Sequence, residues 1–353
     1  MQTERALFKR KNNWPLTAIS IVICVLLMPV STFTFAMPHL FTVIPLILLF
    51  LLGYVGPVSA LGCMAICIFA AGYSIGIPGV LAISILFIPF MAVSVYLTQT
   101  KKEFWLSAAI ASAVAFASAC LVVSMIGVWA KTDAVSAIIR TVTETVNAQP
   151  ELSDWLISLF GQMGLITADA GSTLEIGRLS PDDRVRIIGQ IMALFDTLLR
   201  LQIPMQISTG SLASGVLGQT VLRKSVIKLG YSIEYPPLRT WRVPKGWGRI
   251  LGGTFLLLFV LARLVPQYTR GMYYVFSGLF EQVFALQGIA ALCWMLEERK
   301  RKRITKVMVF LIGYFVLQTP ALILGIADQA FDFTKRREKM GDDKPVNPFD
   351  PRA

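Results

Sequence analysis

Long apolar segments recur along nearly the whole chain, from residue 14 to residue 327. An α-helix needs about 20 apolar residues to cross the roughly 30 Å hydrocarbon layer of a bilayer, and these segments are about that long. Hydrophobic residues make up 55% of the 353 residues and charged residues only 15%. A soluble domain is about one quarter charged. The sequence therefore predicts an all-α fold, a polytopic bundle of transmembrane helices.

The apolar segments divide into about nine spans. Five of them fall within residues 14–130 and four within 201–327. Glycines and a proline at 53–57 split an apolar run that is too long for a single crossing. Segment 201–222 is rich in glutamine, serine and threonine, so we expect other helices to surround it. If one weak segment re-enters without crossing, the number of spans falls to eight.

One long polar interruption, residues 131–200, separates the two groups of spans. Apolar residues at helical spacing predict an amphipathic helix in its first part and another around Trp155. Serine and proline at 180–181, followed by two aspartates, are typical of a helix start. We expect an amphipathic helical insert outside the membrane, which lies on the membrane surface or caps the bundle.

Basic residues cluster in short loops beside the spans, and the net charge is +12. Loops 223–248 and 297–303 are strongly basic, whereas the insert 131–200 carries more acidic than basic residues. The positive-inside rule then places both loops and the N-terminus, 1–13, in the cytoplasm and the insert in the periplasm of a bacterial inner membrane. The charged tail, 328–353, is predicted to be disordered. Because membrane topology accounts for the basic charge, the bilayer is the expected partner and nucleic acid is not.

The five cysteines all lie within apolar segments, which favours small buried residues over a disulfide framework. Cys63 and Cys67 are four residues apart on one helix face, a spacing that could share a metal ion. The chain has a single histidine, however, so we expect neither a metal site nor a cofactor. Phosphate-binding glycine-rich loops and nucleophiles with an evident base are missing from the sequence, which favours a protein that is not an enzyme.

The sharpest candidate for a functional residue is Glu281, near the middle of the apolar stretch 271–296. On a helix it shares a face with Ser277 and several small residues. An ionisable group at this depth costs a few kcal/mol and usually has a partner or a pathway. We expect a site for a ligand, a proton or a cation between segments 201–222, 249–266 and 271–296. The alternative is a structural ion pair, or a neutral carboxyl group, that locks neighbouring helices.

Other polar residues in or near the spans are candidates for the same ligand-binding site. Arg263, Arg270 and Arg200 are candidate partners for the carboxylate of Glu281. Asp196 and Arg200 are four residues apart, a spacing more typical of a helix-surface pair worth a few tenths of a kcal/mol. The candidate ligand-binding residues are Glu281, Gln282, Gln287, Arg263, Arg200 and Asp196.

Three short motifs mark the last third of the chain: 241–244 (WRVP), 287–288 (QG) and 324–333 (LGIADQAFDF). With these motifs the chain resembles the YybS-like family of predicted bacterial multi-pass membrane proteins, a group named for a domain of unknown function. That family is distantly similar to the substrate-binding subunits of energy-coupling-factor transporters. The resemblance implies binding or transport of a small solute, with other membrane subunits or a separate ATPase as partners. The alternative function is a non-catalytic membrane scaffold that organises cell-envelope or cell-shape proteins.

Overall fold

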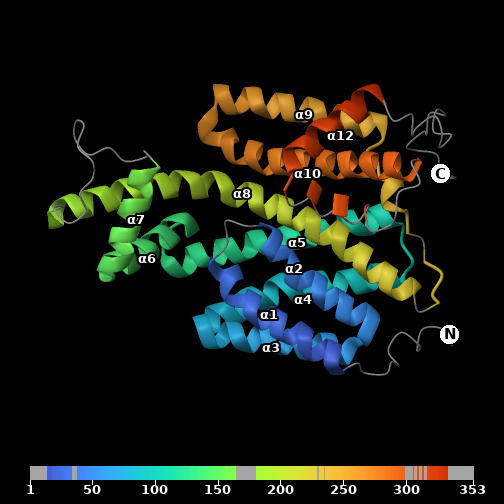
Figure 1. Cartoon of the computed structure of the whole chain (residues 1–353), viewed down its shortest axis with the longest axis horizontal. Helices are drawn as coiled ribbons and strands as arrows, with labels where there is room; N and C mark the ends of the chain where they lie inside the picture. Colours follow the sequence, from blue (N-terminus) through green and yellow to red (C-terminus); the bar gives the residue numbers. More distant parts are fainter. Residues whose placement is uncertain are drawn as a thin grey trace. The chain divides into compact units, whose positions relative to one another are not determined.

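The structure is a computed structural model of the chain (Figure 1). The N-terminal segment 1–13, the loop 297–303 beyond residue 298 and the tail beyond residue 332 lie outside the described residues, so their predictions stay untested. For 25–33 and 38–43 only the backbone is described. The described residues are 14–33, 38–163, 180–228, 230–233, 235–298, 305, 308–309, 312–313 and 316–332.

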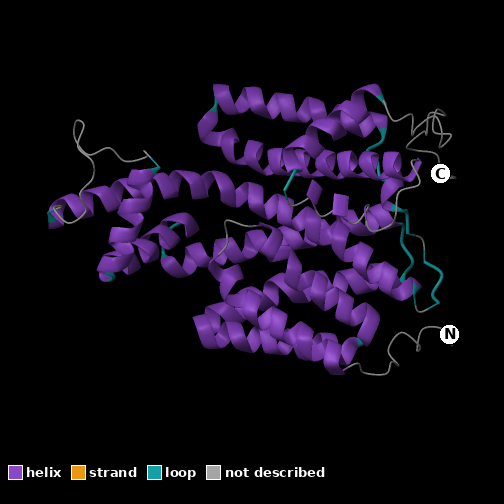
Figure 2. Ribbon diagram, viewed as in Figure 1, coloured by secondary structure: helices purple, strands orange, loops and turns teal. Residues whose placement is uncertain are grey.

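Within these ranges every regular element is a helix, as the ribbon diagram shows (Figure 2). The predicted all-α fold is therefore confirmed for the described residues. The elements are α1 (Trp14–Phe33), α2 (Pro38–Phe50), the π-helix η2 (Leu51–Val55), α3 (Pro57–Ile75), α4 (Ile77–Gln99), α5 (Phe104–Ala130), α6 (Ala134–Ala148), α7 (Pro150–Gln162), α8 (Pro181–Ile227), the 3-10 helix η5 (Leu238–Thr240), α9 (Lys245–Leu264), α10 (Pro266–Glu298) and α12 (Gln318–Phe331).

Five helices in the described part are long and apolar enough to cross a membrane: α4, α5, α8, α9 and α10. Shorter apolar stretches lie at Trp14–Cys24, Ile44–Val55 and Pro57–Tyr73. The helices support a membrane protein, but the predicted number of nine spans is not confirmed. The last predicted span, which was expected to end at residue 327, is interrupted, because Val316 lies in a turn and α12 starts only at residue 318.

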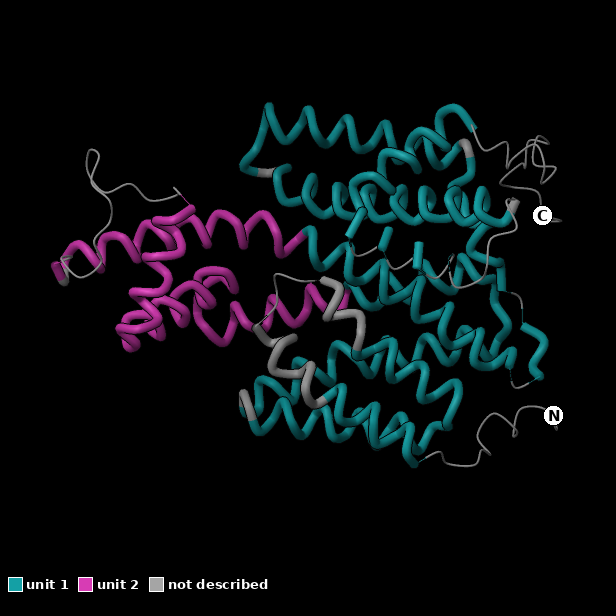
Figure 3. The backbone as a smooth tube through the Cα atoms, in the orientation of Figure 1, with its two compact units in different colours: residues 1–116, 205–353 teal, residues 117–204 magenta. Residues whose placement is uncertain are grey.

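The chain forms two compact units (Figure 3). Unit 1 contains residues 1–116 and 205–353, and unit 2 contains residues 117–204. Helix α8 has 47 residues and contributes to both units. At about 1.5 Å per residue it is about 70 Å long, more than twice the thickness of the hydrocarbon layer. The predicted amphipathic helix after residue 180 and the weak span 201–222 are thus one continuous helix.

Unit 2 has an apolar core of its own, built by the amphipathic helices. Val146 of α6, Ile157 of α7 and Ile191 of α8 are buried in one cluster. Helix α8 begins with a reciprocal cap, in which the Ser180 Oγ accepts a 3.1 Å hydrogen bond from the N–H of Asp183 and donates to its carboxylate at 2.7 Å. The predicted amphipathic helices are therefore present, and their apolar faces pack against one another.

In the N-terminal part of unit 1, α1 and α3 pack together and run in the same direction. Thr17 donates a 3.1 Å hydrogen bond to Ser59, and further along both helices Cys24 lies beside Cys63. Because α1 and α3 are parallel, α2 and η2 return the chain between them. Gly56, with φ of 142°, ends the π-helix at the predicted split, in a backbone region that glycine enters without strain.

In the C-terminal part of unit 1, α10 packs against both α9 and α12 (Figure 1). The backbones of α10 and α12 touch at two glycines, because a Cβ atom on Gly288 would overlap Ala321 and one on Gly325 would overlap Phe284. Small residues allow such close approach of helices. Helix α12 continues to residue 331, so 328–331, which the sequence analysis assigned to the tail, are helical.

Candidate functional site

Glu281 lies about halfway along the 33-residue helix α10 and is half-buried. Its carboxylate accepts a hydrogen bond from the Ser277 hydroxyl at 3.3 Å, which is long for an O–H···O bond. A carboxylate has about four acceptor sites. Among the residues that the structure describes, no other hydrogen bond or ion pair reaches Glu281. Most of the acceptor capacity of this carboxylate is therefore unmet by described side chains.

Aromatic rings lie on the same side of α10 as Glu281. Tyr273, Ser277 and Glu281 follow each other at intervals of four residues, so they share a face. The ring of Tyr273 is centred 5.9 Å from the rings of both Phe255 and Phe259 on α9. Aromatic rings thus lie about two turns from Glu281 on the same face of α10, and such rings attract cations because their faces are electronegative.

Helix α8 touches α10 one turn from Glu281. A Cβ atom on Gly278 would lie 2.6 Å from the Ser208 Oγ and 2.8 Å from the carbonyl oxygen of Met205. Ser208 is fully buried and donates its hydroxyl to that same carbonyl at 2.8 Å. Because α9 packs on α10 as well, Glu281 belongs to the helix that contacts both α8 and α9.

Gln287 is the centre of a buried polar junction. Its Oε1 accepts a 3.0 Å hydrogen bond from the backbone N–H of Val243. Its Nε2 donates to the Oε1 of Gln329 at 3.0 Å and lies 3.4 Å from the carboxylate of Asp328. Gln329 in turn donates to the carbonyl oxygen of Pro244 at 3.4 Å. The three C-terminal motifs quoted from the sequence thus meet at one place and join the segment before α9, helix α10 and helix α12.

A family model described as "Predicted membrane protein (DUF2232)" matches residues 15–329. The chain belongs to this family. The match covers both units, Glu281 and the whole Gln287 junction, and it confirms the predicted class of membrane protein named for a domain of unknown function. Searches of curated proteins and of solved structures find no match.

Two other candidate residues of this DUF2232 protein have different surroundings. Gln282 is buried and accepts a 3.0 Å hydrogen bond from the side-chain amide of Gln318, at the start of α12. Arg263 is exposed near the end of α9, with its guanidinium 5.5 Å from the ring centre of Phe259. Gln282 therefore joins α10 to α12, on a contact separate from the serine that binds Glu281.

Arg200 and Asp196, the remaining candidates, lie in unit 2. The guanidinium of Arg200 is 2.9 Å from the carboxylate of Asp196 and 3.2 Å from that of Asp133. Asp133 also caps α6 by accepting from the N–H of Ser136 at 3.0 Å and from its hydroxyl at 2.6 Å. These bonds from Ser136, aided by Arg200, lower the pKa of Asp133 to about 2. Arg200, a candidate partner for Glu281, is thus engaged by two carboxylates of unit 2.

The role of Arg223 was not predicted, because the sequence placed this residue in a basic loop. Helix α8 includes this residue, and its side chain is fully buried. The guanidinium donates to the carbonyl oxygen of Lys102 at 2.6 Å and to the hydroxyl of Ser107 at 2.7 Å. Its Nε lies 3.4 Å from the Oε1 of Gln219, one turn earlier. That four-residue spacing from a polar span residue is the signal that would have indicated an inward-facing arginine.

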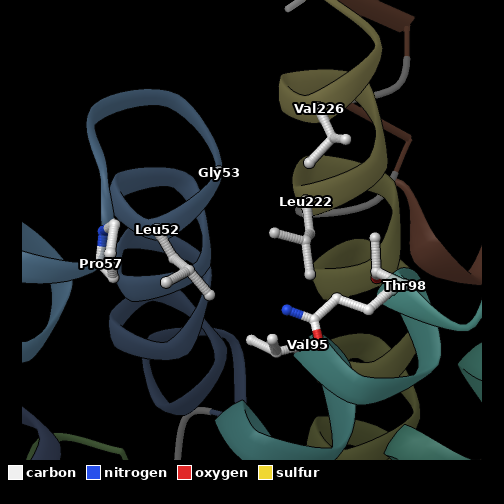
Figure 4. A pocket seen from close by; sticks show the side chains of 8 residues that line it. Leu52, Gly53, Pro57, Val95, Thr98, Leu222 and Val226 are labelled. Carbon is white, nitrogen blue, oxygen red and sulfur yellow. The ribbon is translucent and has the colours of Figure 1, made fainter. Parts of the chain in front are cut away.

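A hollow next to the π-helix is lined mainly by apolar side chains (Figure 4). It contains about 370 Å³ of empty space, part of which is open to solvent. Thr98 contributes a hydroxyl, but this group already donates to the carbonyl oxygen of Ser94 at 2.8 Å. Gln99 contributes a side-chain amide, and the other lining side chains are apolar, so the hollow offers few polar groups to a solute. Its lining residues are Leu52, Gly53, Pro57, Val95, Thr98, Gln99, Leu222 and Val226.

Proposed function

We propose that this DUF2232 protein binds a small cationic solute at Glu281 and that binding serves the passage of that solute into or across the membrane. The observation that carries the proposal is the carboxylate at mid-helix with a single described donor, Ser277. The resemblance to YybS-like proteins, and through them to substrate-binding transporter subunits, supports the same class of function. The chain needs no catalytic step of its own, and a separate ATPase could supply energy.

We expect a cation as the ligand because an ionised carboxylate is energetically unfavourable inside an apolar helix bundle. An ionised group at this depth costs a few kcal/mol when it is alone, and a bound cation offsets that cost. The rings of Tyr273, Phe255 and Phe259 provide further attraction for an ammonium group. An anionic solute would be repelled by the same carboxylate.

The protein can be tested in detergent with a panel of small amines, for example ethylamine, putrescine and tetramethylammonium. A ligand that binds only the folded state at a concentration of 100 times Kd stabilises it by about 2.7 kcal/mol, which raises the Tm. We expect at least one amine to raise the Tm of the wild type and to leave that of Glu281→Gln unchanged. Glu144→Gln, at an exposed glutamate of α6, is the matched control and should behave like the wild type.

The same experiment separates the two functions inferred from the sequence. If the amine raises the Tm of Glu281→Gln as much as that of the wild type, Glu281 is not the binding site. If no amine binds the wild type, and Glu281→Gln co-purifies with cell-envelope proteins as the wild type does, the scaffold function is favoured instead.

A further inference from the structure

Three of the five cysteines meet between α1 and α3. The Sγ atoms of Cys24, Cys63 and Cys67 all lie within 4.8 Å of one another, and all three residues are fully buried. Cys63 and Cys67 are one turn apart on α3, as the sequence indicated, and the third thiol comes from α1, about 40 residues earlier in the chain. All three cysteines are free thiols. The cluster lies apart from the Glu281 site, on other helices.

The separations suit one metal ion. Three sulfur atoms arranged trigonally around an ion at about 2.3 Å lie about 4.0 Å from each other. The sulfur atoms are at most 4.8 Å apart, so each pair has to approach by less than an ångström. Rotation of the side-chain torsions can provide this movement. The ligand set therefore needs no rearrangement of the two helices.

The number and type of ligands select the ion. Thiolates are soft ligands that favour Cu(I), Zn(II) and iron–sulfur clusters. Structural zinc sites have four ligands, whereas Cu(I) is stable with three. In the described part of the chain, the group contains these three cysteines and no histidine or carboxylate as a fourth ligand. Three thiols without a fourth ligand match Cu(I) best.

The apolar surroundings limit how many of the three thiols lose a proton when the metal ion binds. A Cu(I) ion that replaces one thiol proton gives an electrically neutral cluster, and each further proton lost adds one negative charge in an apolar region. Polar groups continue the same interface, because Thr17 and Ser59 form a buried hydrogen bond between α1 and α3, one to two turns from the cysteines.

We infer that Cys24, Cys63 and Cys67 form a site for a thiophilic monovalent metal ion, Cu(I), between the apolar helices α1 and α3. The inference is independent of the proposed function, so Glu281→Gln should bind Cu(I) normally. A role in sensing or moving copper, or in stabilising the contact between α1 and α3, would follow from occupancy of this site.

The test is anaerobic titration of the full-length protein in detergent with Cu(I), in competition with a coloured Cu(I) chelator. We expect the wild type to take up about one equivalent, with X-ray absorption showing sulfur ligands at about 2.2–2.3 Å. Cys24→Ser and Cys63→Ser should lose at least about tenfold in affinity. Cys120→Ser, at a half-buried thiol of α5, is the matched control and should bind like the wild type.

Three outcomes would overturn the inference. The first is a wild type that takes up no Cu(I) from the chelator. The second is a Cys24→Ser variant that binds as tightly as the wild type. The third is a disulfide within the cluster in protein isolated from cells, because its sulfur atoms could no longer act as thiolate ligands. Since the first and third outcomes need only wild-type protein, a variant that fails to fold does not decide the test.

Discussion

The backbone N–H of Val243 donates a 3.0 Å hydrogen bond to the side-chain Oε1 of Gln287. This bond ties the segment before α9 to the middle of α10, and the other end of the same amide reaches α12 through Gln329. Gln287 is only 2% exposed, so water cannot replace these bonds. The junction fixes α10 about two turns from Glu281, which gives the candidate site a rigid support.

Gln287→Ala should destabilise the protein more than a glutamine change at the surface. The substitution removes the hydrogen bonds that Gln287 makes to the N–H of Val243 and to the side chain of Gln329, and each such bond contributes about 0.5–1.5 kcal/mol. Thermal unfolding in detergent should show a clear drop in Tm. Gln162→Ala, at an exposed glutamine at the end of α7, is the control, and an equal effect of both variants would contradict the role of the junction.

Gly325→Ala should loosen the contact between α10 and α12. The added methyl group would overlap the carbonyl oxygen of Phe284, and such overpacking costs about 1–3 kcal/mol. Gly253→Ala on α9 is the matched control, because nothing lies within 4 Å of its Cβ position. Alanine is about 1 kcal/mol better than glycine in a helix, so this variant should be as stable as the wild type or more stable. Similar unfolding temperatures for both variants would show that the two helices are not in close contact.

Arg223→Met should destabilise unit 1 by at least about 2 kcal/mol, because hydrogen bonds to a charged group are lost from Lys102 and Ser107. Arg223→Lys keeps the charge but lacks the planar fork, so we expect only partial rescue. Proteolysis or thermal unfolding measures the effect. Arg140→Met, at an exposed arginine of α6, is the control and should change stability little. If Arg223→Met also changed stability little, the side chain of Arg223 would lie in solvent and not in the core.

Acid should weaken the start of α6. Hydrogen bonds from Ser136, aided by Arg200, hold the pKa of Asp133 at about 2 in the folded state, below its ordinary value of about 3.9. A lowered pKa contributes stability above the ordinary value, and this contribution is lost as the pH falls from about 4 to about 2. Amide hydrogen exchange in the first turn of α6 should therefore accelerate over that range, beyond the intrinsic pH dependence.

Asp133→Asn is the informative variant for this pH effect. Asparagine still caps a helix but has no proton to gain, so the acceleration specific to this turn should vanish. An unchanged acceleration in Asp133→Asn would assign it to another group. Glu144→Gln, further along α6, serves as the control and should keep the wild-type behaviour.

The sequence predicted the helices far better than the contacts between them. The length of the apolar segments placed the end of the first group of spans at residue 130, where α5 ends, and the glycines and proline at 53–57 placed the split before α3, because both signals are local. The length of α8 was missed, since its character changes from amphipathic to apolar near residue 201 without a helix-breaking residue other than Pro204. The break in the last span was missed although Gln318, Thr319 and Pro320 follow the turn at Val316, because the apolar residues on both sides of this short stretch suggested one span.

The candidate site shows the same limit. Glu281 and Gln287 stood out because each is a polar residue inside an apolar stretch. The burial of Arg223 and the approach of Cys24 to the cysteines of α3 depend on pairings between distant segments, 116 and about 40 residues apart, which composition does not reveal. The neighbouring helices also decided the role of Gln287, which proved to join α10 to α12.

The most direct measurement for the central claim is equilibrium binding of the stabilising amine, in radiolabelled form, to the protein in lipid nanodiscs. We expect saturable binding to the wild type and to Glu144→Gln, and a loss of at least about tenfold in affinity for Glu281→Gln, because the counter-charge is removed. Equal binding by the wild type and Glu281→Gln would show that the amine does not bind at Glu281.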